Sequence, residues 1–138
     1  GQILMKTRVE ETIQRHDKGY NCAQAVACSF CKEFGVDEEE MFRIAEGFGL
    51  GMGGMAATCG AVSGAVMLAG LKNSCKNLEQ PASKADTYKL TREITKTFLE
   101  KNGSLTCGEL KGTETGKLRS CPDCIRDAVE IAESILEL

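Results

Sequence analysis

Residues 47–71 read GFGLGMGGMAATCGAVSGAVMLAGL and contain no charged side chain. The beginning of this stretch is too rich in glycine to hold a helix by itself. The remainder, residues 56–71, is apolar but shorter than the ~20 residues that cross a bilayer, so we reject a membrane span. A helix that is apolar on every side lies buried inside a bundle. The stretch therefore predicts an all-α fold around a central, glycine-rich, apolar helix, in which Gly60 and Gly64 let another backbone approach closely.

Helical patterns flank this segment on both sides. Helix formers dominate, and the chain has only two prolines and no tryptophan. Asn21 and Asp37 are good N-cap residues, while Gly35 and Gly103 are placed to end helices. We expect a compact bundle of about five to six helices. They would cover residues 5–17, 22–34, 38–46, 56–71, 83–102 and 121–138.

Length and charge limit the possible functions. The 138 residues suit one domain with a sizeable core, so we expect residues 1–138 to form a single domain. The formal net charge is −3. Binding to nucleic acid or to an anionic membrane would require a basic face. We therefore expect no nucleic-acid partner.

The eight cysteines are the most unusual feature of the composition. No charged segment followed by an apolar one opens the chain, so the sequence shows no secretory signal. We expect a soluble, cytoplasmic protein. In a reducing cytoplasm, cysteines serve in metal binding or redox chemistry more often than in structural disulfides.

Helical geometry sorts several cysteines by the face on which they lie. In the second expected helix, Cys22 falls on the apolar stripe, whereas Cys28 and Cys31 lie roughly 120–180° away from it. We therefore expect Cys22 to point inward and the other two to be peripheral. In the last helix, Cys121 lies in line with the apolar stripe and Cys124 at its edge.

Cys59 and Cys121 each lie at or near the start of an expected helix. Unpaired N–H groups and the helix dipole favour a thiolate there. Thiolates are required both for metal binding and for disulfide exchange. The glycine run before Cys59 could also supply backbone amides to sulfur. With Cys22, and with Cys107 in a short turn, these residues can converge on one site.

Two residues are expected on the surface. Cys75 lies in a polar linker beside lysines and is expected to be exposed and incidental. His16 is the only histidine and lies among charged residues, which favours a solvated position. Without a second histidine, Ser–His or Cys–His catalysis has little to build on.

The Cys-x-x-Cys pairs at residues 28–31 and 121–124 suggest a four-cysteine zinc site as an alternative. The first pair lies within an expected helix, without the glycine-rich knuckle that such sites usually show. A thioredoxin-like interpretation of the second pair lacks the βαβ pattern that should surround it.

The cysteine segments also resemble a known family. Residues 59–64 (CGAVSG), with residues 21–25 (NCAQA) upstream, resemble the C_GCAxxG_C_C family of redox-active proteins. Residues 107–110 (CGEL) and 121–122 (CP) are similar to its third and fourth cysteine segments. The GFG sequence at residues 47–49 is similar to its approach to the glycine-rich loop. The resemblance covers nearly the whole chain.

The resemblance implies four cofactor-binding and metal-binding cysteines: Cys22, Cys59, Cys107 and Cys121. The other four are extra to the family pattern: Cys28, Cys31, Cys75 and Cys124. The family is similar to a domain found beside haem groups in electron-transfer proteins, which makes an iron–sulfur cluster the implied cofactor. The chain has no Cys-x-x-Cys-His sequence, so we predict no covalently attached haem.

Three hypotheses follow. The first is an electron-transfer or redox-sensing domain whose four family cysteines ligate an iron–sulfur cluster. In a variant of this hypothesis, only three of the four cysteines are ligands, which leaves one labile iron position. The second is a metal-free thiol–disulfide relay in which Cys59 attacks and a neighbouring cysteine resolves. The third is a zinc-stabilised helical domain that binds a partner. We expect an unidentified redox partner protein and consider a homodimer through residues 47–71; no enzymatic reaction is assigned.

Overall fold

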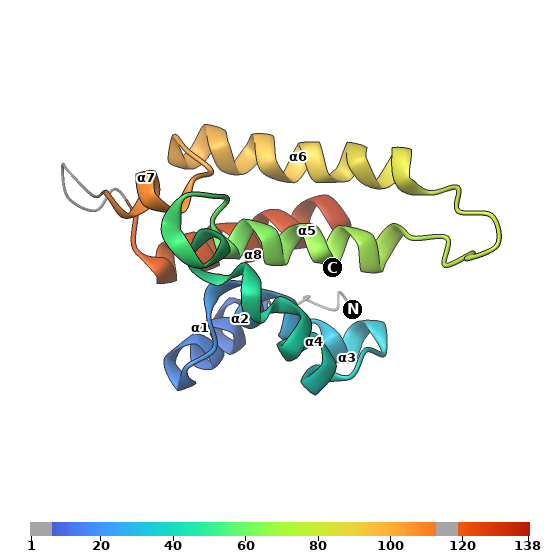
Figure 1. Cartoon of the computed structure of the whole chain (residues 1–138), viewed down its shortest axis with the longest axis horizontal. Coiled ribbons are helices and arrows are strands. Elements are labelled where there is room, and N and C mark those ends of the chain that lie inside the picture. The colour runs from blue at the N-terminus through green and yellow to red at the C-terminus, as the bar shows by residue number, and fades with distance from the viewer. Residues whose placement is uncertain (1–6, 113–118) are drawn as a thin grey trace, which may run out of the picture.

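The structure, a computed structural model, describes residues 7–112 and 119–138, which form an all-α fold (Figure 1). Within these residues there are eight α-helices and no strand: α1 (Val9–Lys18), α2 (Cys22–Cys28), α3 (Cys31–Phe34), α4 (Glu38–Ala45), α5 (Gly60–Asn73), α6 (Lys84–Asn102), α7 (Cys107–Lys111) and α8 (Cys121–Leu136). A 3₁₀ turn, Glu46–Phe48, and an irregular helical turn, Gly51–Met55, connect α4 to α5.

The long helices lie lengthwise beside one another. Figure 1 shows α5 and α6 as the two arms of a hairpin, with α8 alongside and α1 to α4 gathered on the other side of α5. Helix α5 packs against α2, α6 and α8, and α8 also packs against α1. Large apolar side chains are fully buried between them, among them Leu68 of α5, Phe98 of α6, Ile125 of α8 and Phe30 of the turn between α2 and α3. Their burial supplies the main favourable term in folding.

The expected helix boundaries are confirmed where a cap was predicted. Asn21 and Gln24 form a reciprocal capping box at the start of α2. The Asp37 side chain accepts a hydrogen bond from the Glu40 backbone N–H at the start of α4. Gly35 and Gly103 follow α3 and α6 in the left-handed conformation. Each of these residues satisfies helix-end groups that would otherwise lack a partner.

The predicted helix over residues 22–34 is two helices. The Ser29 hydroxyl donates to the Ala25 carbonyl at 2.7 Å, and the Ser29 carbonyl accepts from Arg8, the residue before α1, at 3.1 Å. In a continuous helix that carbonyl would accept from Glu33, whose N–H instead donates to Phe30. This break, and the short helix α7 where we expected only a turn, explain why there are eight helices rather than about five to six.

The apolar stretch of residues 47–71 is also interrupted. Leu50, Met52 and Met55 have positive φ angles of 54°, 64° and 67°, which non-glycine residues rarely adopt. Regular helix begins only at Gly60. Within the part of the chain that the structure describes, no helix is long and apolar enough to cross a membrane.

The close approach predicted at Gly60 and Gly64 is confirmed. A Cβ atom on Gly60 would lie 3.2 Å from the Ala23 backbone nitrogen. A Cβ atom on Gly64 would lie 2.8 Å from Val26 Cβ and 3.0 Å from the Ala23 carbonyl oxygen. Glycine at these two positions therefore lets the backbone of α5 lie directly against α2, and this contact holds Cys59 next to Cys22.

Replacing Gly64 by alanine is expected to destabilise the protein by about 1–3 kcal/mol, because the added methyl overlaps α2 in a packed core. Gly70→Ala is the matched control, since it lies in the same helix with nothing within 4 Å of the added Cβ. That change should be neutral or stabilise by up to about 1 kcal/mol through helix propensity. Urea unfolding of both variants measures the difference; equal effects would contradict the packing argument.

Candidate metal centre

Cys22 and Cys121 are brought together by two capped helix starts. Asn21 caps the helix that begins at Cys22, and Ser120 caps the helix that begins at Cys121. The sulfurs of the two cysteines lie within 4.8 Å of each other. The Cys22 thiol, together with contact from Lys111, lowers the pKa of Cys121, whereas the neighbouring Cys121 and burial raise the pKa of Cys22. Cys22 therefore keeps its proton beside the Cys121 thiolate.

Cys59 forms a second sulfur pair, with Cys124 of α8. Contact with the Cys124 thiol lowers the pKa of Cys59 below its ordinary value despite burial, and the backbone N–H groups of Ala61 and Val62 add to this effect. Contact with Cys59, followed by burial, raises the pKa of Cys124. The amides that act on Cys59 thus come from the first turn of α5, as its position at a helix start predicted. The glycine run, which was named as a further source of amides, lies against Cys107 instead.

Cys107 joins the group through backbone contacts with the segment before α5. The Cys107 N–H donates to the Ala57 carbonyl at 2.9 Å, and the Cys59 N–H donates to the Leu105 carbonyl at 2.7 Å. Gly51 (φ +56°) packs so closely that its Cβ would lie 2.5 Å from Cys107 Cβ. Burial raises the pKa of Cys107, and the charges of Cys59 and Cys121 raise it further. The glycine-rich turn therefore positions Cys107 without donating to its sulfur.

Lys111 places one positive charge among these thiols. Its Nζ contacts the Sγ of Cys121. Burial opposes the charge, but the neighbouring cysteines, with Cys121 first among them, raise the pKa of Lys111 above its ordinary value. The charge of Lys111 lowers the pKa of every cysteine in the group: Cys22, Cys59, Cys107, Cys121 and Cys124. We call these five residues the cysteine cluster.

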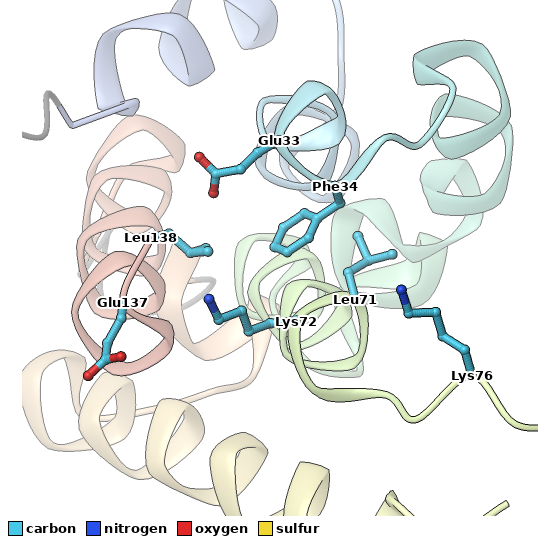
Figure 2. A pocket seen from close by; sticks show the side chains of 7 residues that line it. All are labelled: Glu33, Phe34, Leu71, Lys72, Lys76, Glu137 and Leu138. Carbon is cyan, nitrogen blue, oxygen red and sulfur yellow. The ribbon is translucent and has the colours of Figure 1, made fainter.

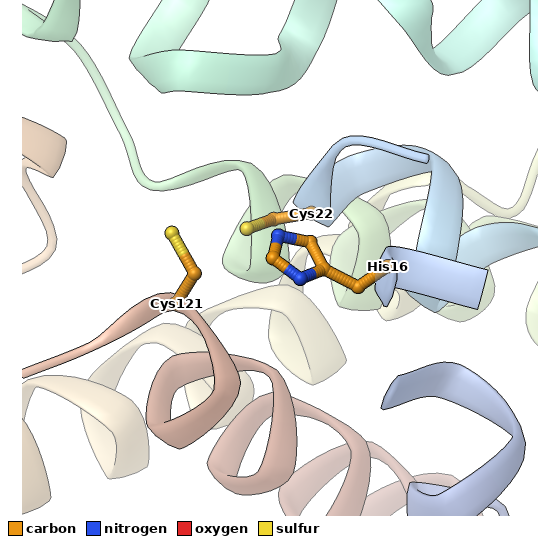
Figure 3. Close-up of side chains that lie close together, drawn as sticks. All are labelled: His16, Cys22 and Cys121. Atoms are coloured by element: carbon orange, nitrogen blue, oxygen red, sulfur yellow. The ribbon is translucent and has the colours of Figure 1, made fainter. Parts of the chain in front are cut away.

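His16 faces the same cluster from α1. Figure 3 shows its ring beside the sulfur of Cys22, with Cys121 opposite. A ring nitrogen and the two sulfurs all lie within 4.8 Å of one another, an arrangement that can hold a metal ion. The sequence analysis placed His16 on the solvated surface, which is wrong: the residue is half-buried. Gly19 was the sequence signal for this position: it ends α1 in the left-handed conformation, and the chain then turns directly into α2, which begins at Cys22.

The comparisons with known proteins identify the family. The family model described as "Putative redox-active protein (C_GCAxxG_C_C)" matches residues 20–135. The chain belongs to this family. A relative from Archaeoglobus fulgidus, named only as an uncharacterized protein, is 27% identical over 128 residues, which is 85% of this chain and 85% of that protein. No solved structure matches the chain.

The structure gathers the four cysteines that the resemblance to the C_GCAxxG_C_C family implies, and it adds two neighbours. The family-implied residues, Cys22, Cys59, Cys107 and Cys121, come from four separate segments. Cys124, which lay at the edge of the predicted stripe, is fully buried beside Cys59. Its position one turn after Cys121 was the available signal. His16 lies outside the residues that the family model matches.

The remaining cysteines lie elsewhere. Cys28 and Cys31, which we expected to be peripheral, are 1% and 2% exposed, because α4 covers them with Met41. Burial and the charge of Cys31 raise the pKa of Cys28 to about 12. This pair and Cys124 belong to different hydrophobic clusters. The structure therefore does not assemble the two Cys-x-x-Cys pairs into one four-cysteine zinc site.

Cys75 is exposed, as predicted. The Ser83 hydroxyl, followed by the backbone amides of Ala82 and Asn77, lowers the pKa of Cys75 to about 7. We expect its alkylation by iodoacetamide to reach half its maximal rate near pH 7, because only the thiolate reacts. Mass spectrometry of peptides labelled over a pH series measures this rate. Buried Cys28 is the internal control and should stay unmodified; labelling of Cys28 as fast as Cys75 would contradict the assignment.

A surface pocket of about 470 Å³ lies apart from the cysteine cluster (Figure 2). Its lining includes the apolar side chains of Phe34, Leu71 and Leu138 and contains no cysteine. Cys59 precedes the start of α5, whereas Leu71 lies near its end, a separation of about 18 Å along the helix. The pocket is therefore not part of the candidate metal centre.

Proposed function

We propose that this member of the C_GCAxxG_C_C family is an electron-transfer domain whose cysteine cluster holds an iron–sulfur cluster. The observation that carries the proposal is the gathering of five cysteines, from four segments of the chain, near the charge of Lys111, whose ammonium contacts Cys121. The family description, a redox-active protein, supports the same chemistry. Buried cysteines that serve only as core residues need no cation beside them.

The donor set fits this cofactor. Iron–sulfur clusters are held by cysteine thiolates, and soft thiolates select for such clusters over hard cations. Lys111 acts as a stand-in cation, because its ammonium contacts Cys121 and its charge acts on all five sulfurs. Loading would require Lys111 to leave Cys121, and its flexible side chain allows this movement.

We propose Cys22, Cys59, Cys107 and Cys121 as the ligands, with Cys124 as a neighbour that keeps Cys59 in place. The bound cluster would supply one-electron chemistry. Burial of Cys59, Cys107 and Cys124 would exclude water from it, and Lys111 would offset part of its negative charge. Both effects tune the potential of a cluster.

The proposal also covers the setting of the site. We treat residues 1–138 as one domain in the reducing cytoplasm, with the apolar segment of residues 47–71 at its centre. The packing of α5 against α2, α6 and α8 supports this arrangement. Electrons would be exchanged with a separate redox protein on the side of half-buried Cys121.

The test is an analysis of iron, zinc and acid-labile sulfide, with a visible spectrum, on protein purified without oxygen. Brown protein that contains iron and sulfide is the expected result. Colourless protein with stoichiometric zinc would replace the proposal by a structural zinc site that unfolds with a chelator. Protein that stays metal-free after reconstitution with iron and sulfide would overturn the proposal.

A metal-free thiol–disulfide relay is the second candidate, favoured by the two sulfur pairs. Cys59 is 2% exposed, so half-buried Cys121 is the better entry point. Its thiolate would attack a partner disulfide and release one partner thiolate. Cys22 would then lose its proton and attack the Cys121 sulfur, which forms the Cys22–Cys121 disulfide and releases the second partner thiolate. Treatment of metal-free protein with oxidised glutathione, followed by mass spectrometry, tests for this disulfide.

A further inference from the structure

His16 approaches the cysteine cluster from a direction that none of the cysteines uses. It comes from the last turn of α1, a helix that packs against both α2 and α8. Its ring lies beside Cys22 and Cys121 (Figure 3), the two cluster cysteines that begin those helices. Cys59 and Cys124 lie deeper, with 2% and 0% of their surfaces exposed.

We propose that His16 is a nitrogen ligand of the metal centre, which makes the centre a mixed histidine–cysteine site rather than an all-cysteine one. The inference rests on the proposed function in that it assumes a metal at the cysteine cluster. It concerns a residue outside the range that the family model matches.

The distances allow coordination with small movements. Metal–sulfur bonds of about 2.3 Å and metal–nitrogen bonds of about 2.0–2.1 Å place two ligand atoms of a tetrahedral ion about 3.5–3.8 Å apart. The nitrogen and the two sulfurs already lie within 4.8 Å of one another. The required contraction is about 1 Å, which side-chain rotation can supply.

The surrounding charges favour a cation at this position. The Cys121 sulfur contacts the ammonium of Lys111, the positive group that a metal ion would replace. A neutral imidazole beside two thiolates binds borderline and soft metals well. Because His16 and Cys121 are half-buried, a metal ion bound by them would lie nearer to solvent than one bound by the buried Cys59.

A histidine ligand has a defined redox consequence. Exchange of a thiolate for a neutral imidazole removes one negative charge from the centre, and histidine ligation raises the potential of iron–sulfur clusters. The oxidised form of this centre would therefore be easier to reduce than that of an all-cysteine centre in the same protein.

The experiment titrates reduced, metal-free protein with Co²⁺ alone and follows the visible absorption of the bound ion. His16→Ala is expected to weaken binding by at least about a hundredfold, because one ligand is lost. His16→Cys should restore affinity with stronger sulfur-to-metal charge-transfer absorption. Gln14→Ala, an exposed residue of the same helix, is the matched control and should match the wild type.

The outcomes separate this inference from the proposed function. Wild-type protein that holds no iron or sulfide after reconstitution, but shows the His16-dependent Co²⁺ spectrum, would overturn the iron–sulfur proposal and support the histidine ligand. Iron-containing protein in which His16→Ala and Gln14→Ala give the same Co²⁺ affinity and spectrum would overturn the histidine ligand alone. Failure of the wild type to bind Co²⁺ would also overturn it.

Discussion

Replacing Cys59 by serine is expected to abolish retention of iron and sulfide. Structural metal sites of four ligands bind with about 10–16 kcal/mol, so one ligand contributes on the order of 3 kcal/mol, or at least about a hundredfold in affinity. A serine hydroxyl is a poor substitute for a soft thiolate. The measurement is iron and sulfide per chain after anaerobic gel filtration.

The substitution is well suited to separate ligation from folding. Cys59 is the N-cap residue of α5, and serine is among the best N-cap residues, so the start of the helix should be preserved. Cys75→Ser is the control, since Cys75 is exposed in the loop between α5 and α6. Full iron and sulfide in Cys59→Ser would remove Cys59 from the ligand set and make its neighbour Cys124 the next residue to replace.

Replacing Asp127 by alanine is expected to cost about 3 kcal/mol of unfolding free energy, through loss of a buried carboxylate with two cationic partners. Asp127 Oδ1 lies 2.9 Å from Lys101 Nζ, and Oδ2 lies 2.7 Å from Arg119. The carboxylate is 3% exposed and joins α8 to α6 and to the segment that leads into Cys121. Its removal leaves the partly buried Arg119 guanidinium without this partner.

Urea unfolding of Asp127→Ala measures this cost. Lys101→Ala is the matched comparison, because the lysine side chain is 50% exposed and Asp127 keeps Arg119 as a partner, so the expected loss is smaller, about 1 kcal/mol. A similar small loss of unfolding free energy in both variants would contradict the prediction that the buried Asp127 carboxylate stabilises the contact between α6 and α8. Because Arg119 directly precedes the Ser120 cap of α8, Asp127→Ala should also weaken Co²⁺ binding at Cys121.

Local sequence signals predicted the helix ends and one helix contact. Asn21, Asp37 and Gly103 act within one turn of their own helices, so their effects could be predicted from neighbouring residues. Gly64 was predicted to allow a close approach because the absence of a Cβ is a property of the residue itself. The split between α2 and α3 could not be predicted, because it depends on Arg8, which lies before α1 and 21 residues away in the chain.

The direction in which a cysteine points was harder to predict. Periodicity on one helix gives angles relative to that helix alone, and it placed Cys28 and Cys31 at the periphery. The structure buries them because α4 folds back over that face with Met41. A second covering helix changes which faces are exposed, and no pattern within α2 contains that information.

The sequence by itself determined the all-α class and most helix boundaries, because these depend on residue type and on neighbours within a few positions. The resemblance to the family implied the four cysteines, and tertiary structure alone decided which groups surround them. It paired Cys59 with Cys124, placed Lys111 against Cys121 and turned His16 toward Cys22. The physical reason is that these contacts join helices far apart in the chain, and their geometry exists only after α1, α5, α7 and α8 have packed.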